Sequence, residues 1–289
     1  MADLTGRKVI ITGASQGLGA EIARQYVNSG ASVVLCSRTQ RDLNAIKEDL
    51  EQDLKENQKI VVAKCDVSKS NEVEAMISMS LDVLGHVDVL VNNAGVYGPL
   101  GMIDEVEWNE WKRAIEINLY GTACPSQIIF KHFRKRRYGK IINLSGGGAT
   151  SPLPRISAYA ASKAAVVRLT ETLALEGLDY NIDVNAVAPG ALNTRLMTSL
   201  LDAGPEKIGD DFFNKMKEIS EKGGAPLAKG AELCVWLGSP ASDGITGKLI
   251  SAIWDPWQNL QNFRDDLDGK DIYTLRRIVP KDRGLNWDK

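Results

Sequence analysis

Tyr159 and Lys163 are the two side chains whose types and spacing best suit catalytic chemistry. They stand four residues apart in Tyr159-Ala-Ala-Ser-Lys163, so on a helix both project from one face. A phenol with its ordinary pKa of about 10 is a poor acid or base at neutral pH, and a neighbouring ammonium lowers that pKa by stabilising the phenolate. The pair is therefore predicted to exchange a proton with a substrate oxygen. Because the same spacing is common in surface pairs on helices, the prediction requires a reactant site beside it.

A glycine-rich turn near the amino end supplies such a site. The apolar run at 8–12 leads into Thr-Gly-Ala-Ser-Gln-Gly-Leu-Gly and then into an amphipathic segment at 20–28. A strand, turn and helix in this order let the backbone approach a pyrophosphate at the positive end of the helix. The spacing is G-x-x-x-G-x-G, and such glycines can also serve only a tight turn. The residues expected to hold a dinucleotide here are Gly13, Ser15, Gln16, Gly17, Leu18 and Gly19.

The end of the second apolar run indicates which dinucleotide binds. An NAD site places an acidic residue near this point for the ribose hydroxyls, whereas this chain has Ser37 and Arg38. Arg38 would meet a 2′-phosphate, and Arg41 would add a second positive charge. The sequence therefore predicts NADP(H) rather than NAD(H), the alternative being that Arg38 is a solvated residue at a strand end.

Two further strand ends carry candidate cofactor residues. Asp66 and Val67 follow the third run, where a carboxylate would either bond the adenine amine or cap the following turn. Asn93, Ala94 and Gly95 follow the fourth run, and small residues there would let a loop pass tightly under the nucleotide.

The order of apolar runs predicts the fold that positions these residues. Seven short β-branched runs alternate with helical patterns, which indicates an α/β fold with a doubly wound, seven-stranded parallel sheet of the Rossmann type. A single domain is expected over 1–253, followed by an aromatic-rich extension at 254–289 that docks somewhere. The connection at 191–228 is expected to be a mobile lid. The strands are expected at 8–12, 32–36, 59–65, 87–91, 140–144, 182–188 and 248–252, and the helices at 20–28, 40–56, 70–84, 105–137 and 156–178.

Composition excludes several other classes of function. The 289 residues are 44% hydrophobic and 25% charged, with a formal net charge of −2, which gives no footprint for nucleic acid. Two histidines and four cysteines without C-x-x-C spacing predict neither a metal site nor a disulfide framework. No apolar stretch is long enough to span a bilayer, and the amino end lacks the apolar core of a signal peptide. A cytoplasmic protein with a small-molecule substrate is expected.

Taken together, the motifs resemble the short-chain dehydrogenase/reductases in their short, single-domain form. The glycine turn, Asn92-Asn-Ala-Gly95, Tyr159-Ala-Ala-Ser-Lys163 and Pro189-Gly190 occur in that family's order and approximate spacing over residues 5–253. The resemblance implies that Asn118 holds a water in a proton relay through Lys163, which also bonds the nicotinamide ribose. It further implies cofactor contacts from Pro189, Gly190 and Thr194, and a homo-oligomer, a tetramer or dimer, formed through the helices at 105–137 and 156–178.

One position departs from the family pattern. The family's serine, thirteen residues before the tyrosine, is replaced by Gly146, and Ser145 stands one residue earlier. Ser145 is the predicted donor to the substrate oxygen, although neighbouring strand residues point to opposite faces, so the glycine-rich loop would have to re-aim it.

The resemblance implies an NADP(H)-dependent oxidoreductase that interconverts a carbonyl and an alcohol by hydride transfer, with Tyr159 as acid and base. The alternative is a non-catalytic NADP(H)-binding regulator or scaffold of the same fold. Arg155, Met197, Phe212 and Phe213 are candidate pocket residues.

Overall fold

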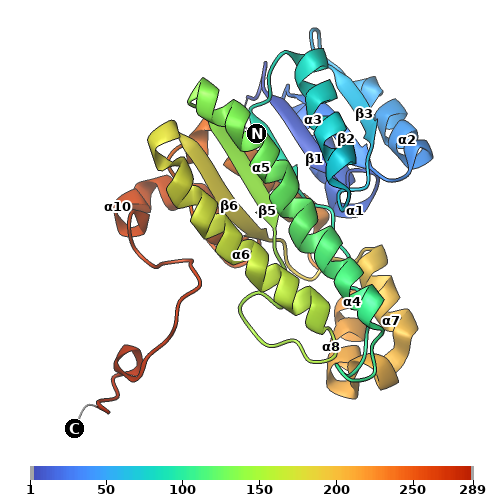
Figure 1. Ribbon diagram of the computed structural model, residues 1–289, viewed down its shortest axis with the longest axis vertical. Helices are drawn as coiled ribbons and strands as arrows, with labels where there is room; N and C mark the ends of the chain where they lie inside the picture. The colour runs from blue at the N-terminus through green and yellow to red at the C-terminus, as the bar shows by residue number, and fades with distance from the viewer. Residues whose placement is uncertain (1–2, 288–289) are drawn as a thin grey trace.

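A computed structural model describes residues 3–287 and contains one parallel sheet of seven strands in the order β3-β2-β1-β4-β5-β6-β7. Strands β1 to β3 run from the centre of the sheet to one edge. The chain then returns to the centre, and β4 to β7 run to the other edge (Figure 1). The predicted doubly wound, seven-stranded sheet is confirmed. The strands are β1 Lys8–Thr12, β2 Ser32–Ser37, β3 Ile60–Lys64, β4 Val89–Asn92, β5 Gly139–Leu144, β6 Ile182–Ala188 and β7 Leu249–Ser251.

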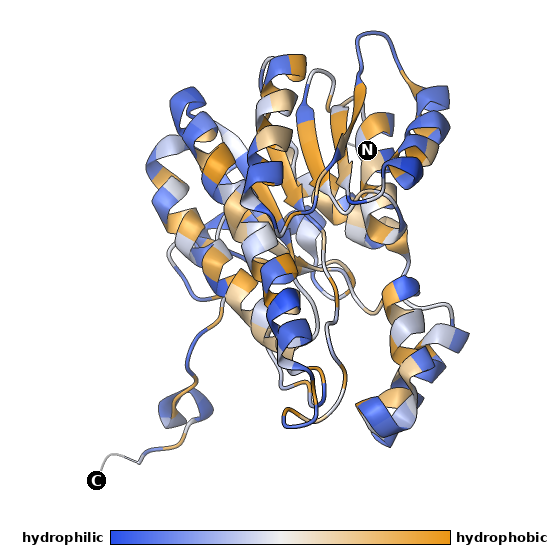
Figure 2. Cartoon of the chain, turned by 45° about the vertical axis from the view of Figure 1, so that its right-hand side comes forward, coloured by the Kyte–Doolittle hydropathy of each residue, from blue (hydrophilic) through white to orange (hydrophobic). Residues whose placement is uncertain are grey.

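Helices cover both faces of the sheet, which explains why the strands are continuous apolar runs rather than alternating ones. Apolar side chains of α1, α2 and α9 pack on one face, and those of α3, α5 and α6 on the other. Figure 2 shows the apolar strands between helices whose outer surfaces are hydrophilic. The helices are α1 Gly17–Asn28, α2 Gln40–Leu50, α3 Ser70–Leu84, α4 Trp108–Ile115, α5 Gly121–Arg136, α6 Ser157–Gly177, α7 Arg195–Ile208, α8 Asp210–Glu221, α9 Leu227–Leu237 and α10 Arg264–Leu267.

Three sequence expectations about the helices are corrected. The helix expected at 40–56 ends at Leu50 and continues only as a 3₁₀ turn, Glu51–Asp53. The single helix expected at 105–137 is α4 and α5, separated by a π-helical turn at Glu116–Tyr120. The segment 191–228, expected as a connection between the sixth strand and the next helix, contains α7 and α8, with a kink at Gly204 in α7, and its role as a mobile lid stays a prediction.

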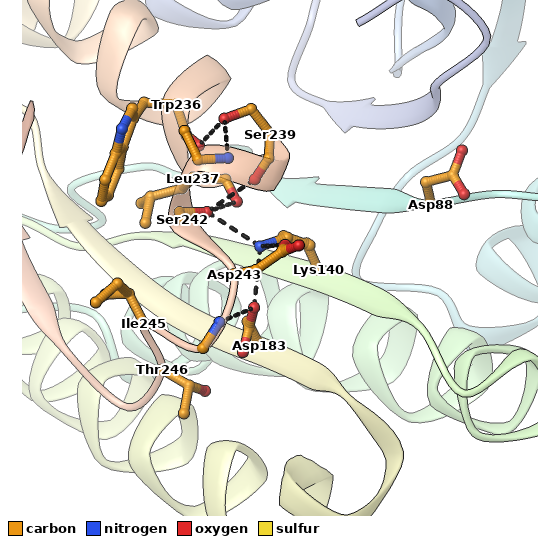
Figure 3. Close-up of polar contacts among 12 residues, drawn as sticks. Asp88, Lys140, Asp183, Trp236, Leu237, Ser239, Ser242, Asp243, Ile245 and Thr246 are labelled. Carbon is orange, nitrogen blue, oxygen red and sulfur yellow. Dashed lines mark hydrogen bonds and ion pairs between the residues drawn. The ribbon is translucent and has the colours of Figure 1, made fainter. Parts of the chain in front are cut away.

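The amino-terminal edge of the sheet is fixed by a buried ion-pair network (Figure 3). Lys140, at the start of β5, is 1% exposed, and its Nζ lies 2.9 Å from Asp183 Oδ2 and 2.7 Å from Asp243 Oδ1. Ser242 Oγ accepts a third hydrogen bond from Nζ at 3.1 Å. The three bonds satisfy a buried ammonium, which would otherwise be costly. This network joins β5, β6 and the turn after α9, so it holds the sheet from the edge opposite the candidate site.

The carboxyl-terminal extension docks over part of its length. Trp257, Leu260 and Leu267 are buried in the core under α9, where the Trp236 and Trp257 rings lie 5.9 Å apart. Lys248 Nζ donates to the main-chain oxygens of residues 267, 270 and 272 at 2.8, 2.8 and 3.1 Å. The far end of the extension projects away from the sheet and its helices (Figure 1). Within residues 3–287, no helix has the length and apolarity needed to cross a membrane.

Candidate active site

The predicted site residues lie at the carboxyl ends of the strands, next to the point where the strand order reverses between β1 and β4. The glycine turn follows β1 and is braced by the loop after β4. Asn93 Nδ2 donates to the main-chain oxygens of Thr12 and Gly13, at 3.0 and 3.1 Å. A Cβ at Gly19 would overlap Gly13 O, so this close approach requires glycine. Asn93, expected to contact the cofactor, thus supports the turn with its side chain.

Thr12 is a site residue that the sequence reading missed. Its Oγ1 accepts hydrogen bonds from Asn93 N at 3.0 Å and Ala94 N at 3.1 Å, and donates to Val91 O at 3.4 Å. The hydroxyl therefore ties the end of β1 to the loop after β4. A threonine at the end of an apolar run looks like an ordinary strand residue, and only its position directly before the first glycine marks it.

The turn has the features of an anion cradle. Gly13 and Gly17 have φ of 64° and 54°, values that favour glycine. Gln16, before α1, is extended, and its side chain makes no capping bond within residues 3–287, which leaves the first N–H groups of α1 available for a phosphate. A Cβ at Gly17 would lie 3.4 Å from Thr194 Cγ2, so Thr194 faces the turn. Ser15 and Leu18 lie in the same turn, Leu18 being buried.

The loop that carries Thr194 is held close to the same edge. Pro189 and Gly190 follow β6, and Gly190 has a φ of 90°. A Cβ at Gly190 would lie 2.9 Å from Ile253 Cγ1 and 3.0 Å from Ala225 Cβ. A tightly packed loop thus carries the predicted residues Pro189, Gly190 and Thr194, of which Thr194 lies against the glycine turn.

The end of β2 carries a free cation, and the end of β3 carries a carboxylate that is already engaged. Arg38 is exposed, and across the described residues (3–287) it makes no ion pair or hydrogen bond; the same holds for Arg41. Ser37 Oγ accepts a hydrogen bond from the main chain two residues on, at 3.3 Å. Asp66 caps its own turn, accepting from Ser68 N at 3.1 Å and from Arg113 at 2.6 Å.

Val67 packs directly against Gly121, the first residue of α5. A Cβ on this glycine would lie only 2.6 Å from Val67 Cγ2. This contact places the loop after β3 against the helix that follows the π-helical turn. The two predicted residues Asp66 and Val67 are therefore fixed mainly by protein contacts.

Tyr159 and Lys163 project from α6 toward this edge, and both are buried. Lys163 Nζ donates to Leu144 O, the last residue of β5, at 2.6 Å, and lies 5.7 Å from the centre of the Tyr159 ring. Burial lowers the pKa of Lys163 to about 8. The expectation that this ammonium lowers the pKa of Tyr159 is wrong for this structure: burial, followed by the neighbouring Tyr97, raises that pKa. A raised pKa keeps this phenol neutral at pH 7.

Asn118 lies in the π-helical turn and is completely buried. Its Oδ1 accepts from Val96 N at 2.8 Å, and its Nδ2 donates to Val96 O at 2.8 Å and to Ser162 Oγ at 2.9 Å. The side chain thus clamps the loop after β4 and uses all its donor hydrogens. A Cβ at Gly95 would lie 3.3 Å from Asn118 Oδ1 and 3.5 Å from Lys163 Nζ, so these three residues converge.

Gly146 is the residue that faces the Tyr159 phenol. A Cβ at Gly146 would overlap Tyr159 Oη, so the absence of a side chain is what lets the phenol approach β5 so closely. Ser145 is 4% exposed, and its Oγ is fully covered without a hydrogen-bond partner among residues 3–287. The predicted donor Ser145 therefore adjoins the glycine that faces the phenol, but its own hydroxyl is covered by protein.

An apolar cluster covers the side of Tyr159 away from the sheet. It joins the loops after β4 and β5 to α7 and α8, and Phe212 and Phe213 are half-buried within it. Arg155, also predicted to line the pocket, is not part of this cluster. Its guanidinium donates a hydrogen bond to Glu206 O at 2.9 Å and so links its loop to α7. The buried members are Ile156, Tyr159, Met197, Leu200, Ile208 and Met216, with Tyr97, Leu100, Leu153, Leu201 and Ile219 packed beside them.

Known proteins are similar to this chain in sequence or in fold. The chain is 36% identical over 242 residues to an L-fucose dehydrogenase of Oryctolagus cuniculus, which covers 83% of this chain and 82% of the relative. It is 35% identical over 249 residues to 3beta-hydroxysteroid dehydrogenase 1 of Eggerthella lenta, with coverage of 86% and 92%. A crystal structure of a variant of actinorhodin polyketide ketoreductase with NADPH superposes with a TM-score of 0.78 at 28% identity, covering 87% and 97% of the two chains.

A family model described as short chain dehydrogenase matches residues 7–204, which include the glycine turn and the Tyr159–Lys163 pair. On the sheet order, the site and this match, the chain belongs to the short-chain dehydrogenase family of oxidoreductases.

Proposed function

We propose that this chain is an NADP(H)-dependent oxidoreductase that interconverts a carbonyl and an alcohol, with Tyr159 as the acid and base. One observation carries the proposal: a continuous set of contacts links the glycine turn to the catalytic pair. Asn93 bonds Gly13, Gly95 follows two residues later, and Lys163 Nζ lies against Gly95. A dinucleotide held at the turn would therefore extend toward Lys163 and the phenol beside it.

The residues at the turn fit such a cofactor. The glycines, the free N–H groups of α1 and Thr194 would hold the phosphates, and Arg38 would pair with a 2′-phosphate. The cofactor, when bound, supplies or accepts the hydride. Asp66, Val67, Asn93, Ala94 and the loop at Pro189 and Gly190 would complete the walls around it.

Side chains of this protein would transfer the proton to and from the substrate oxygen. A buried, neutral Tyr159 donates its hydroxyl proton to the substrate oxygen in the reduction and receives it in the reverse reaction. Lys163, fixed by Leu144 O, would bond the nicotinamide ribose and so hold the cofactor beside the phenol. Because both donor hydrogens of the Asn118 side chain are used, a relay water would bond its main-chain oxygen, which also accepts from Thr122 Oγ1 at 2.8 Å.

The apolar cluster around Tyr159 favours an apolar ketone over a sugar. Met197, Leu200, Phe212 and Phe213 offer no hydrogen-bond partners for hydroxyl groups. Of the two relatives, the hydroxysteroid dehydrogenase is thus the better guide to substrate class than the fucose dehydrogenase.

A homo-oligomer is proposed through the face formed by α5 and α6, which lie side by side (Figure 1). Leu175 and Leu178 at the end of α6 and Tyr120 before α5 are 72%, 56% and 57% exposed. A groove of about 480 Å³ between the two helices is lined by Cys124, Phe130 and other side chains. A monomer would leave this apolar surface in water.

The test is turnover by the purified chain against NADPH and NADH. The panel contains a 3-ketosteroid and a β-ketothioester for reduction, and L-fucose for oxidation with NADP⁺ or NAD⁺. We expect NADPH consumption with at least one ketone, and weaker use of NADH. Arg38→Ser is expected to weaken NADPH binding about 10-fold and to leave NADH binding unchanged, because only the 2′-phosphate contact is lost.

Equal use of both cofactors, with no effect of Arg38→Ser, would contradict the NADP(H) assignment. Tight NADPH binding with no turnover on any compound would instead support the non-catalytic regulator.

A further inference from the structure

In this structure no side chain at position 145 or 146 can serve as the second hydrogen-bond donor to a substrate carbonyl oxygen. An oxygen that gains negative charge as hydride arrives is stabilised by a second hydrogen-bond donor beside the proton donor. Position 146 cannot supply it, because it is glycine and Tyr159 Oη occupies the space of its side chain. Ser145 Oγ is fully covered by protein. A donor has to come from elsewhere around the Tyr159 hydroxyl.

Tyr97 lies directly against Tyr159. The two ring centres are 4.7 Å apart, with the rings tilted by 60°. Tyr97 is also the second cause, after burial, of the raised pKa of Tyr159, so the two hydroxyls are close enough to interact electrostatically. Two phenols, from the loop after β4 and from α6, are therefore presented together.

The hydroxyl of Tyr97 is unused. Within residues 3–287, neither the Tyr97 hydroxyl nor the Tyr159 hydroxyl makes a hydrogen bond. Both remain open to solvent, whereas Ser145 Oγ is fully covered by protein. A half-buried tyrosine ordinarily uses its hydroxyl as a donor. An unpaired donor that remains open beside the catalytic phenol is placed to meet a ligand oxygen.

The backbone around Tyr97 is unusually well fixed for a loop. Asn118 bonds both the N–H and the carbonyl of Val96. On the other side Gly98 has a φ of 75°, and a Cβ there would lie 2.5 Å from Ala114 Cβ, so this residue packs tightly on α4. Tyr97 is thus held between two anchored neighbours, which keeps the entropic cost of positioning its hydroxyl low.

We propose that Tyr97 donates a hydrogen bond to the substrate carbonyl oxygen and so takes the place of the side chain missing at Gly146. Tyr97 keeps its proton throughout: Tyr159 transfers a proton to the oxygen, and the hydride goes to the carbon. This inference rests on the proposed function, and it assigns two phenols to one oxygen.

The test compares Tyr97→Phe, Ser145→Ala and Tyr138→Phe in steady-state reduction of the ketone that the panel identifies, with NADPH affinity and urea unfolding measured in parallel. Tyr138→Phe is the matched control, because its hydroxyl is likewise unpaired among residues 3–287 but its ring lies under Arg7 at the opposite edge of the sheet. We expect Tyr97→Phe to lower kcat/KM about 100-fold, mainly through kcat. NADPH affinity and the unfolding midpoint should not change, since no hydrogen bond is lost.

The inference is overturned if Tyr97→Phe keeps kcat/KM within twofold of the wild type, and most directly if Ser145→Ala alone causes the loss. Losses in both variants support Tyr97 as one of two donors. These results are distinct from failure of the proposed function, in which the wild type itself turns over nothing. In that case both proposals fall, because there is no substrate oxygen to polarise.

Discussion

Lys163 and Tyr159 show at the scale of single residues what spacing can and cannot predict. Their separation by four residues correctly predicted a shared helix face, because the helical period depends only on the sequence. Their protonation was mispredicted, because it depends on how deeply α6 is buried against β5 and the apolar cluster. Burial raises the pKa of the phenol and lowers that of the amine, since it disfavours the charged form of each.

The lowered pKa of Lys163 leads to a prediction about stability. Below pH 8 the amine is protonated in both states, so the folded protein bears the cost of a buried ammonium. Between pH 8 and about 10.5 the folded protein releases this proton while the unfolded chain keeps it, so the free energy of unfolding rises with pH. We expect the wild type to gain about 3 kcal/mol over that interval relative to Lys163→Met.

Urea unfolding at pH 7, 8, 9 and 10 measures this difference, and using the difference cancels the contributions of the other tyrosines and lysines. Lys131→Met, at an exposed position on α5, is the control and should track the wild type. Parallel curves for wild type and Lys163→Met would show that Lys163 is not desolvated as described.

At the scale of elements, the seven strands could be read from the sequence because helices cover both faces and select β-branched runs. The break between α4 and α5 could not, since the residues 116–120 of the π-helical turn continue the helical pattern. The break nevertheless matters, because it carries Asn118, whose amide clamps Val96. The role of Thr12 was also invisible, because its partners are main-chain N–H groups from a loop about 80 residues away.

Thr12→Val tests whether this hydroxyl holds the cofactor turn in place. Valine keeps the shape but leaves the N–H groups of Asn93 and Ala94 without their acceptor, so we expect a loss of 1–3 kcal/mol in the free energy of unfolding. NADPH affinity should fall about 10-fold, because the loop after β4 loosens from the glycine turn. Thr172→Val removes only an exposed hydroxyl that bonds Arg168 O within α6, and should change neither quantity. Unchanged NADPH affinity in Thr12→Val would remove this residue from the site.

At the scale of the whole molecule, the sheet brings together residues that are far apart in sequence. The glycine turn and Tyr159 are more than 130 residues apart, yet parallel strands place both at one edge. The sequence predicted that the extension at 254–289 docks, and its first half does, under α9. The anchor was not predictable, because Lys248 binds main-chain oxygens and leaves no pattern in side-chain types. The projecting end, with Ile278 and Leu285 exposed, lies beyond this anchor.

The central claim is that this fold delivers a neutral phenol to a substrate held beside a bound dinucleotide. Its most direct test is a single-turnover measurement of NADPH oxidation in Tyr159→Phe, with NADPH affinity measured on the same protein. We predict unchanged affinity, because phenylalanine keeps the ring and removes only the hydroxyl, and a loss of at least about 1000-fold in the oxidation rate. Oxidation at the wild-type rate in this variant would contradict the account, because hydride transfer would then proceed without the proton donor proposed for it.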